Sequence, residues 1–252
     1  LYAEPVPVVA PDGGQMTIRA LALDDHGRET RGAATYHLDL TGPVPTITPA
    51  ADQPDPSNAA AIRFVVAFSE PVFGFADDDI VLGGDAQPAG AAVTALGGNR
   101  YEVAVSGMTQ DGAVTITLVE SAVTDAAGNP NTEAVLADNR VDYDRTPPVA
   151  TLDSHPAQRD PANSLPIVYT VVFSEPVVGF TAGDVQITAA GAPPTVNVLA
   201  ADPPDGRHFL VQVEGVAADG AVTFDVPAGG VPDLAGNVNA ASQAGDVTVV
   251  YD

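Results

Sequence analysis

Carboxylate side chains recur at fixed places along this chain, and their chemistry is the most specific that the sequence offers. One class follows an apolar run in Phe-Ser-Glu-Pro, a second opens the turn Asp-x-Ala-Gly-Asn, and a third stands two residues before a Thr-Gly or Thr-Pro pair. Oxygen ligands without His or Cys are typical of Ca²⁺, which takes about six to eight of them. The candidate ligands are Asp39, Glu70, Asp125 and Asn129, and then Asp144, Glu175, Asp233 and Asn237.

Catalytic chemistry has no comparable support in the sequence. The four His residues do not recur between repeats, and no Gly-x-Ser-x-Gly elbow or His-x-x-x-His metal spacing is present. Cysteine is absent, which excludes disulfides, thiolate zinc sites and thiol nucleophiles. We therefore expect a protein that is not an enzyme.

The charge of the chain excludes two classes of partner. It carries 33 acidic residues against nine Arg and no Lys, for a formal net charge of -24. Binding to nucleic acid or to anionic membranes requires clustered Lys and Arg that displace counterions from phosphates. We expect neither partner, and no apolar run is long enough to insert into a membrane.

An internal repeat sets the domain organisation. The stretch 68–75, FSEPVFGF, returns as FSEPVVGF at 173–180, and the stretch 125–131, DAAGNPN, returns as DLAGNVN at 233–239. Tyr143-Asp144 returns as Tyr251-Asp252. The repeat predicts one domain over residues 43–144 and a second over 145–252.

Residues 1–42 resemble the back half of a third copy, with about three strands. Asp12-Gly13 corresponds to Asp111-Gly112, and the stretch 24–28, DDHGR, corresponds to DAAGN. Either the natural chain extends upstream, or a neighbouring chain completes this segment. A mature natural chain of only 25.5 kDa would contradict the first alternative. The first residues lack the basic and apolar pattern of a signal peptide, which suggests a mature chain or an internal fragment.

Hydrophobic residues alternate with a period of two, which is the pattern of half-buried strands. Alternating runs cover 62–68, 101–105 and 114–118, and the same runs return in the second copy. Asp-Gly and Gly-Gly-Asn turns separate the runs. About seven short strands per 100 residues predict an all-β chain of tandem immunoglobulin-like antiparallel β-sandwiches without a disulfide.

These motifs together resemble the bacterial immunoglobulin-like repeats of large surface adhesins. The resemblance rests on Phe-Ser-Glu-Pro-Val-x-Gly-Phe, Asp-x-Ala-Gly-Asn-x-Asn and the closing Val-x-Tyr-Asp, which recur in the same order over 43–252. It implies a rod-like extracellular array on a bacterial surface, often tied together by calcium. Neighbouring repeats of the same chain would be the immediate partners.

The order of the strands predicts where the carboxylates meet. In a seven-stranded antiparallel sandwich the second and sixth strands finish at the end where the domain begins. Glu70 and Asp125 follow these strands, and Asp39 enters in the linker at the same end. Three carboxylates in one small volume repel one another unless a cation neutralises them. A calcium site is therefore expected at this junction, and another at Glu175, Asp233 and Asp144.

Structural explanations stand beside the calcium hypothesis. The Asp and Asn of Asp-x-Ala-Gly-Asn can form a turn by themselves. Glu70 before Pro71 can simply oppose pairing at an exposed strand end. Among the other acidic residues, Asp77 and Asp78 read as a solvated run, whereas Asp55 and Asp160 read as turn caps or as additions to a junction.

We therefore expect a structural or adhesive segment of a bacterial surface or secreted adhesin, stiffened by Ca²⁺. Two alternatives stay open: spacer domains of a secreted enzyme, and a self-assembling filament or surface-layer subunit. A host or surface receptor, or like subunits, would be the further partners.

Overall fold

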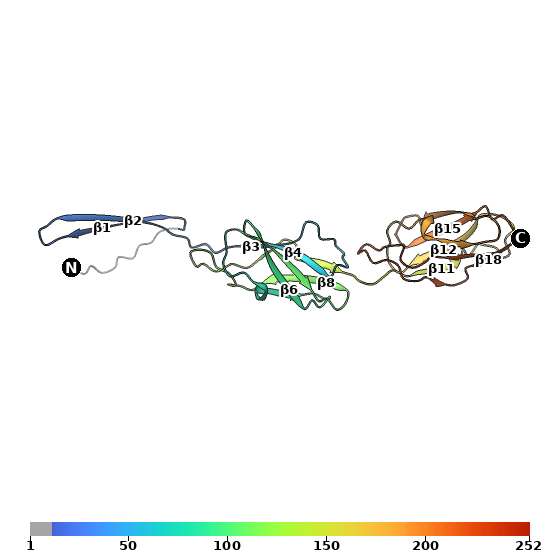
Figure 1. The fold of residues 1–252 in the computed structure, drawn as a ribbon, viewed down its shortest axis with the longest axis horizontal. Coiled ribbons are helices and arrows are strands. Elements are labelled where there is room, and N and C mark those ends of the chain that lie inside the picture. Colours follow the sequence, from blue (N-terminus) through green and yellow to red (C-terminus); the bar gives the residue numbers. More distant parts are fainter. Residues whose placement is uncertain (1–11) are drawn as a thin grey trace.

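The computed structural model describes residues 12–252 and is built almost entirely of β-strands. A β-hairpin and two β-sandwiches follow one another along the long axis, with the C-terminus at the far end (Figure 1). No helix in the described part of the chain is long and apolar enough to cross a membrane.

The N-terminal hairpin consists of β1 (Gln15–Leu23) and β2 (Glu29–His37). The strands pair antiparallel over their full lengths, from Gln15 opposite His37 to Leu23 opposite Glu29. The described part of segment 1–42 thus holds two strands, where about three were expected, and residues 1–11 lie outside the described residues. Every residue of β2 is exposed, because no second sheet in the described part of the chain covers the hairpin.

The first sandwich contains two sheets that face each other across an apolar core. The larger sheet has the order β6-β7-β4-β3-β9 and the smaller has the order β10-β8-β5, with a short 3-10 helix, η1 (Asp77–Asp79), before β5. The strands are β3 (Pro45–Pro49), β4 (Ala61–Phe68), β5 (Ile80–Gly83), β6 (Gly90–Gly97), β7 (Arg100–Ser106), β8 (Gly112–Leu118), β9 (Val135–Leu136) and β10 (Arg140–Tyr143).

The second sandwich repeats this topology strand for strand. Its sheets have the orders β14-β15-β12-β11-β17 and β13-β16-β18, with η2 (Ala182–Asp184) before β13. The strands are β11 (Ala150–Ser154), β12 (Ile167–Phe173), β13 (Gln186–Thr188), β14 (Thr195–Ala200), β15 (His208–Glu214), β16 (Gly220–Asp225), β17 (Gln243–Ala244) and β18 (Thr248–Tyr251). Each sandwich therefore has seven antiparallel strands and one two-residue strand, β9 or β17, that pairs in parallel with the first strand of its domain.

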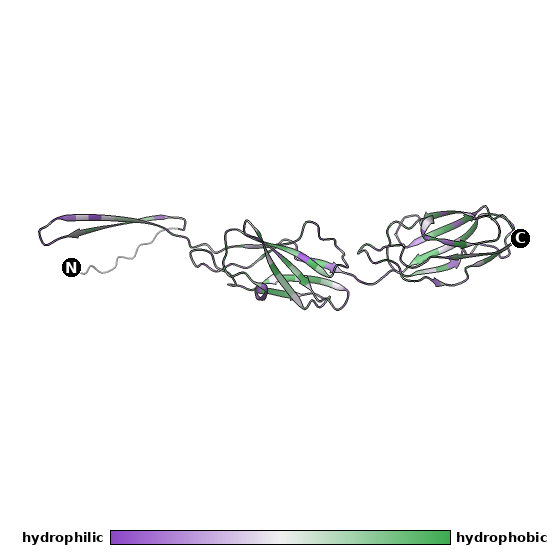
Figure 2. Ribbon diagram, viewed as in Figure 1, coloured by the Kyte–Doolittle hydropathy of each residue, from purple (hydrophilic) through white to green (hydrophobic). Residues whose placement is uncertain are grey.

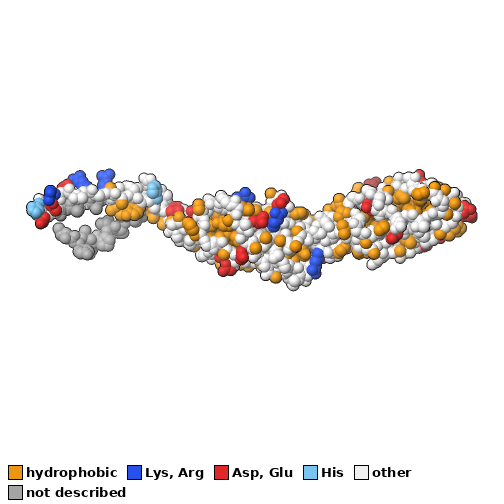
Figure 3. Space-filling model, viewed as in Figure 1, with side chains coloured by type: hydrophobic (Ala, Val, Ile, Leu, Met, Phe, Trp, Pro, Cys, Tyr) orange, Lys and Arg blue, Asp and Glu red, His pale blue; other side chains and the backbone are white. Residues whose placement is uncertain are grey.

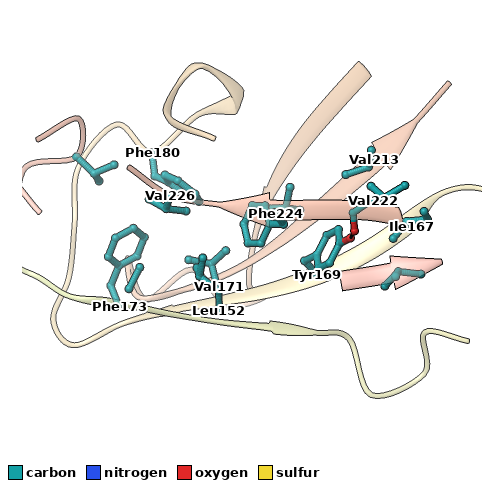
Figure 4. Packing of buried hydrophobic residues seen from close by; sticks show 14 of the residues in the cluster. Leu152, Ile167, Tyr169, Val171, Phe173, Phe180, Val213, Val222, Phe224 and Val226 are labelled. Carbon is teal, nitrogen blue, oxygen red and sulfur yellow. Dashed lines mark hydrogen bonds between the residues drawn. The ribbon is translucent and has the colours of Figure 1, made fainter. Parts of the chain in front are cut away.

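The alternating side chains of the strands form one core in each sandwich. Hydrophobic positions alternate with polar ones along the strands (Figure 2), as a sheet with one buried face requires. In the second domain the Tyr169 ring stacks on Phe224 at 4.9 Å, and its hydroxyl donates to the carbonyl of Val222 at 2.8 Å (Figure 4). Phe64 fills the corresponding place in the first domain, and both rings are fully buried.

The acidic side chains lie on the surface of the domains, outside the apolar cores (Figure 3). Acidic side chains lie at separated points of both domains in the view of Figure 3, among uncharged and hydrophobic atoms. Dispersed acidity of this kind keeps like molecules apart through mutual repulsion. The carboxylates that matter for a site are those that the fold gathers at the ends of the domains.

Candidate metal centres at the domain junctions

The fold brings Asp39, Glu70 and Asp125 together at the lower junction, below the first sandwich. Asp39 lies in the linker after β2, Glu70 follows β4, and Asp125 follows β8. One carboxylate oxygen from each lies within 4.8 Å of the other two. Asp125 is buried, Glu70 is half-buried and Asp39 is exposed, so the group opens to solvent on the linker side.

The upper junction, between the two sandwiches, repeats the arrangement. Asp144 lies in the linker after β10, Glu175 follows β12 and Asp233 follows β16. Their carboxylate oxygens also lie within 4.8 Å of one another, and here none of the three residues is fully exposed. Two successive junctions thus hold equivalent groups, each made of an Asp from the linker, a Glu after the second strand and a buried Asp after the sixth strand of the domain.

The buried Asp of each group is fixed by its own turn. Oδ1 of Asp125 accepts from the backbone N–H groups of Ala127 and Asn129, both at 2.8 Å. Oδ1 of Asp233 likewise accepts from Gly236 at 2.7 Å and Asn237 at 2.8 Å. The Gly of the motif has a φ of 92° at Gly128 and 95° at Gly236 in the two copies, a conformation that other residues rarely adopt. The motif therefore shapes the turn whether or not a cation is bound.

Asn129 and Asn237 lie at the junctions but present a nitrogen where an oxygen ligand was expected. Nδ2 of Asn129 donates to Oδ2 of Asp125 at 2.7 Å and to the carbonyl of Asp39 at 3.1 Å. Nδ2 of Asn237 donates to Oδ2 of Asp233 at 2.9 Å and to the carbonyl of Asp144 at 3.0 Å. Two acceptors face each amide, so the amide must turn its donor toward them. These side chains tie the turn to the linker, and we leave them out of the proposed ligand set.

Burial and repulsion by neighbouring carboxylates both raise the pKa of the Glu at each junction. Burial, and then the charges of Asp39 and Asp125, raise the pKa of Glu70. Burial, and then the charges of Asp144 and Asp233, raise the pKa of Glu175. Deprotonation of each Glu is therefore less favourable than in an isolated side chain, and a bound cation would offset this cost.

The buried Asp of the lower junction behaves differently. Burial alone would raise the pKa of Asp125, but hydrogen bonds from the side chain and backbone of Asn129, and from the following turn, lower it overall. This carboxylate is held in its charged form by the fold itself. At the lower junction the turn thus lowers the pKa of Asp125, whereas burial and neighbouring charges raise that of Glu70.

A fourth carboxylate lies near each group, and it is not among the ligands expected from the sequence. Asp12 accepts from the backbone N–H of Leu40 at 2.7 Å and from the hydroxyl of Thr41. Asp111 accepts from the N–H of Arg145 at 2.9 Å and from the hydroxyl of Thr146. Asp12 and Asp111 also contribute to the raised pKa values of Glu70 and Glu175. Their signal in the sequence is the repeated Asp-Gly, which by itself indicates only a turn.

Asp24, Asp25 and His26, at the tip of the hairpin, form another group of possible ligands. Asp24 Oδ1 accepts from the N–H groups of His26 and Arg28, which is the bonding pattern of the Asp125 turn. Arg28 stands where that turn has Asn, and its Nε lies 2.8 Å from Asp24 Oδ2. Its guanidinium already neutralises the carboxylate, so we assign no cation there.

The remaining acidic candidates have structural roles. Asp55 accepts from the N–H of Asp142 in β10, and Asp160 accepts from that of Val250 in β18, both at 2.9 Å, so each ties a loop to the last strand of its domain. Asp77 and Asp78 are exposed, as expected of a solvated run, and Oδ1 of Asp77 also accepts from the N–H of Val93 at 2.6 Å. Asp77 lies beside the edge of the sheet, and only the tertiary structure places it there.

A polar contact joins the two sandwiches on the other side of the upper junction. Asn58 Nδ2 donates to Asn237 Oδ1 at 3.0 Å, and its backbone N–H donates to the carbonyl of Ala235 at 3.3 Å. Gly236 packs against the same side chain, since a Cβ there would lie 3.6 Å from it. Asn163, the counterpart of Asn58 in the second domain, is exposed at the far end.

Replacing Asn58 by Ala should loosen the upper junction without unfolding either sandwich. The exposed side chain contributes a hydrogen bond worth about 1 kcal/mol, and that bond lies between the domains. Residual dipolar couplings of the two domains, measured in chelator, should show a wider spread of orientations. Asn163→Ala is the matched control and should leave the spread unchanged. Equal effects of the two substitutions would contradict this role for Asn58.

No family model and no curated protein matches the sequence. Among solved structures, the chain is similar to FdeC, an Escherichia coli adhesin, at 12% identity and a TM-score of 0.42, covering 95% of this chain and 75% of that one. It is similar to invasin, a bacterial integrin-binding protein, at 13% identity and a TM-score of 0.41, covering 80% of this chain and 40% of that one. The N-terminal part of the bacterial S-layer protein SbsC matches at 12% identity and a TM-score of 0.28, covering 83% and 44%. At these low scores we base the function on the residues of this chain.

Proposed function

We propose that this chain is a structural or adhesive segment of an extracellular bacterial surface protein, a rod of immunoglobulin-like domains that Ca²⁺ stiffens at the junctions. The observation that carries the proposal is the recurrence of one carboxylate group at two successive junctions. Each group draws on a linker and on two loops of the following domain, so one cation would hold linker and domain together. The proposed ligands are Asp39, Glu70 and Asp125, and Asp144, Glu175 and Asp233, with Asp12 and Asp111 adjacent.

The hairpin of β1 and β2 supports an array that contains a further sandwich beside the two described. Its Asp24 turn has the same hydrogen bonds as the Asp125 turn, and β1 pairs with β2 as β8 pairs with β10. Ile18 and Tyr36 on the hairpin are 48% and 54% exposed, whereas Ile116 and Val141 on β8 and β10 are buried. We infer that the hairpin is the back half of another sandwich, whose remaining strands would cover these side chains.

Removing calcium should soften the rod and lower its stability. Extracellular modules bind Ca²⁺ with dissociation constants of about 10⁻⁴–10⁻³ M. At free calcium about 20-fold above such a constant, each site would stabilise the folded state by roughly 1.8 kcal/mol. Small-angle scattering and melting curves in calcium and in chelator measure both effects. Identical scattering and melting in the two buffers would exclude the calcium role, and magnesium at equal concentration is the control.

Replacing Glu175 by Gln should have opposite effects in the two buffers. In chelator the substitution removes a charge that Asp144 and Asp233 repel, so the second domain should gain up to about 1 kcal/mol. In calcium it removes a ligand, so the stabilisation by calcium should fall. Melting temperatures of both proteins in both buffers test this. An equal calcium-induced rise in the variant and the parent would show that Glu175 is not a ligand.

A further inference from the structure

The far end of the first sandwich, where its linker leaves after β10, is the surface that contacts the second sandwich. Asn58, in the loop between β3 and β4, donates its Nδ2 to Oδ1 of Asn237 at 3.0 Å and its backbone N–H to the carbonyl of Ala235 at 3.3 Å. Both acceptors belong to the Asp-x-Ala-Gly-Asn turn of the second domain. The first domain thus recognises this turn by one side chain and one backbone group.

The first domain holds Asn58 beside its own linker. The backbone N–H of Ser57 donates to the carbonyl of Asp142 in β10 at 2.9 Å, and that of Asp144 donates to the carbonyl of Ser57 at 3.1 Å. These two bonds fasten the loop to the last strand. The linker that leaves at Asp144 therefore starts next to Asn58.

The second sandwich repeats this arrangement at its own far end. The N–H of Ala162 donates to the carbonyl of Val250 in β18 at 2.7 Å, and that of Asp252 donates to the carbonyl of Ala162 at 2.9 Å. Asn163 follows Ala162 directly. It therefore stands beside Asp252 on the same backbone frame that holds Asn58 in the first domain.

The Asp-Gly turn before β16 also keeps its place at this end. Gly220 lies opposite Tyr251, which is the register of the corresponding turn before β8 in the first domain. Asp219 therefore takes the position of Asp111. The carboxylate of Asp111 accepts from the linker, through the N–H of Arg145 at 2.9 Å and the hydroxyl of the next residue.

These polar groups are free in the second domain. Neither the side chain nor the backbone N–H of Asn163 has a hydrogen-bond partner among the described residues, and the carboxylates of Asp219 and Asp252 have none there either. All three residues are exposed. In the first domain the equivalent Asn and Asp use these groups on the next domain and on the linker. The second domain thus presents a surface whose occupied counterpart is visible in the same chain.

We propose that the far end of the second sandwich is a docking surface for a further domain of the same kind, which follows in the same chain. Asn163 donates to the Asp-x-Ala-Gly-Asn turn of that domain, and Asp219 accepts from the linker between them. The linker keeps the two ends together, so a few hydrogen bonds suffice to orient them despite the acidity of the chain. The inference rests on the function proposed above, since it identifies the partner of this surface in the rod, but it requires no cation.

A chain lengthened by one more copy of residues 145–252 tests the surface. The addition places after Asp252 the linker and domain that already follow Asp144. Measurements in chelator make the outcome independent of the calcium role. The backbone N–H of Asn163 should exchange roughly fivefold more slowly in the lengthened chain than in the original one, which is the equilibrium factor of one hydrogen bond.

Two substitutions at one repeat position provide a matched control. Asn163→Ala should widen the spread of orientations between the second and the added domain and leave the first junction unchanged. Asn58→Ala should do the reverse. Residual dipolar couplings of the lengthened chain, with one domain isotope-labelled at a time, measure both spreads.

Three results in the lengthened chain would overturn the proposal. They are an added domain that tumbles independently of the second, an Asn163 N–H that exchanges as fast as in the original chain, and equal effects of the two substitutions at the new junction. Protection of Asn163 in the original chain that rises with protein concentration would also overturn it, because the occupant would then be a second copy.

Discussion

Replacing Asn239 by Ala is expected to lower the free energy of unfolding of the second domain by about 3–5 kcal/mol. This Asn closes the Asp-x-Ala-Gly-Asn-x-Asn motif and is only 2% exposed. Its Oδ1 accepts from the N–H groups of Gly229, Gly230 and Val231 at 2.9–3.1 Å. Its Nδ2 donates to the carbonyls of Pro227 and Ala240 at 2.9 and 3.1 Å. The Ala variant would leave the buried N–H of Val231 and the part-buried N–H of Gly230 without this acceptor.

The first domain supplies a matched comparison for this prediction. Asn131 occupies the same position, but its side chain makes three such hydrogen bonds, to Val123, Val119 and Thr132. Asn131→Ala should therefore cost less, about 2 kcal/mol. Urea unfolding followed by NMR signals from each domain separates the two effects. A loss below about 1 kcal/mol for Asn239→Ala would show that water replaces the side chain without cost.

Replacing Asp233 by Ala is expected to destabilise the second domain by about 2 kcal/mol in chelator. The carboxylate is 4% exposed and accepts from Gly236 and from the backbone and side chain of Asn237. Losing these bonds outweighs the relief of repulsion against Glu175 and Asp144. The same variant should lose the calcium response of the upper junction, because a proposed ligand is gone.

The sign of the change in melting temperature distinguishes Asp233 from Glu175, two carboxylates of the upper junction. Asp233→Ala should lower the melting temperature in chelator, whereas Glu175→Gln should raise it, because only Asp233 is held by its own turn. Asp125→Ala is the control in the other domain and should leave the second domain unchanged. A rise in melting temperature for Asp233→Ala would mean that repulsion, rather than the turn, dominates at this position.

The fold could be predicted because its signals are local. Period-two alternation at Ile62, Phe64 and Val66 requires a strand with one buried face, and Asp-Gly turns such as Asp111-Gly112 mark where strands reverse. Because the motifs repeat, each of these signals occurs in both domains. The same reasoning placed Glu70 and Asp125 at one end of a domain, since strand direction follows from strand number.

The roles of individual polar groups could not be predicted in this way. Asn129 presents its nitrogen because Oδ2 of Asp125 and the carbonyl of Asp39 both face it, and one of these lies in the preceding linker. Asp77 accepts from the N–H of Val93 on β6, a strand that begins 13 residues later in the chain. Hydrogen-bond partners of this kind depend on how loops pack, which sequence spacing does not specify.

By itself, the sequence determined that this chain is a tandem array of β-sandwiches whose recurring acidic residues gather at the domain ends, because strand period, turn chemistry and repeat spacing act over short distances. Only the tertiary structure decided which carboxylates share a junction with Asp111 and which Asn ties one domain to the next. These outcomes depend on contacts between segments far apart in the chain, and the same motif acquires different partners in each copy.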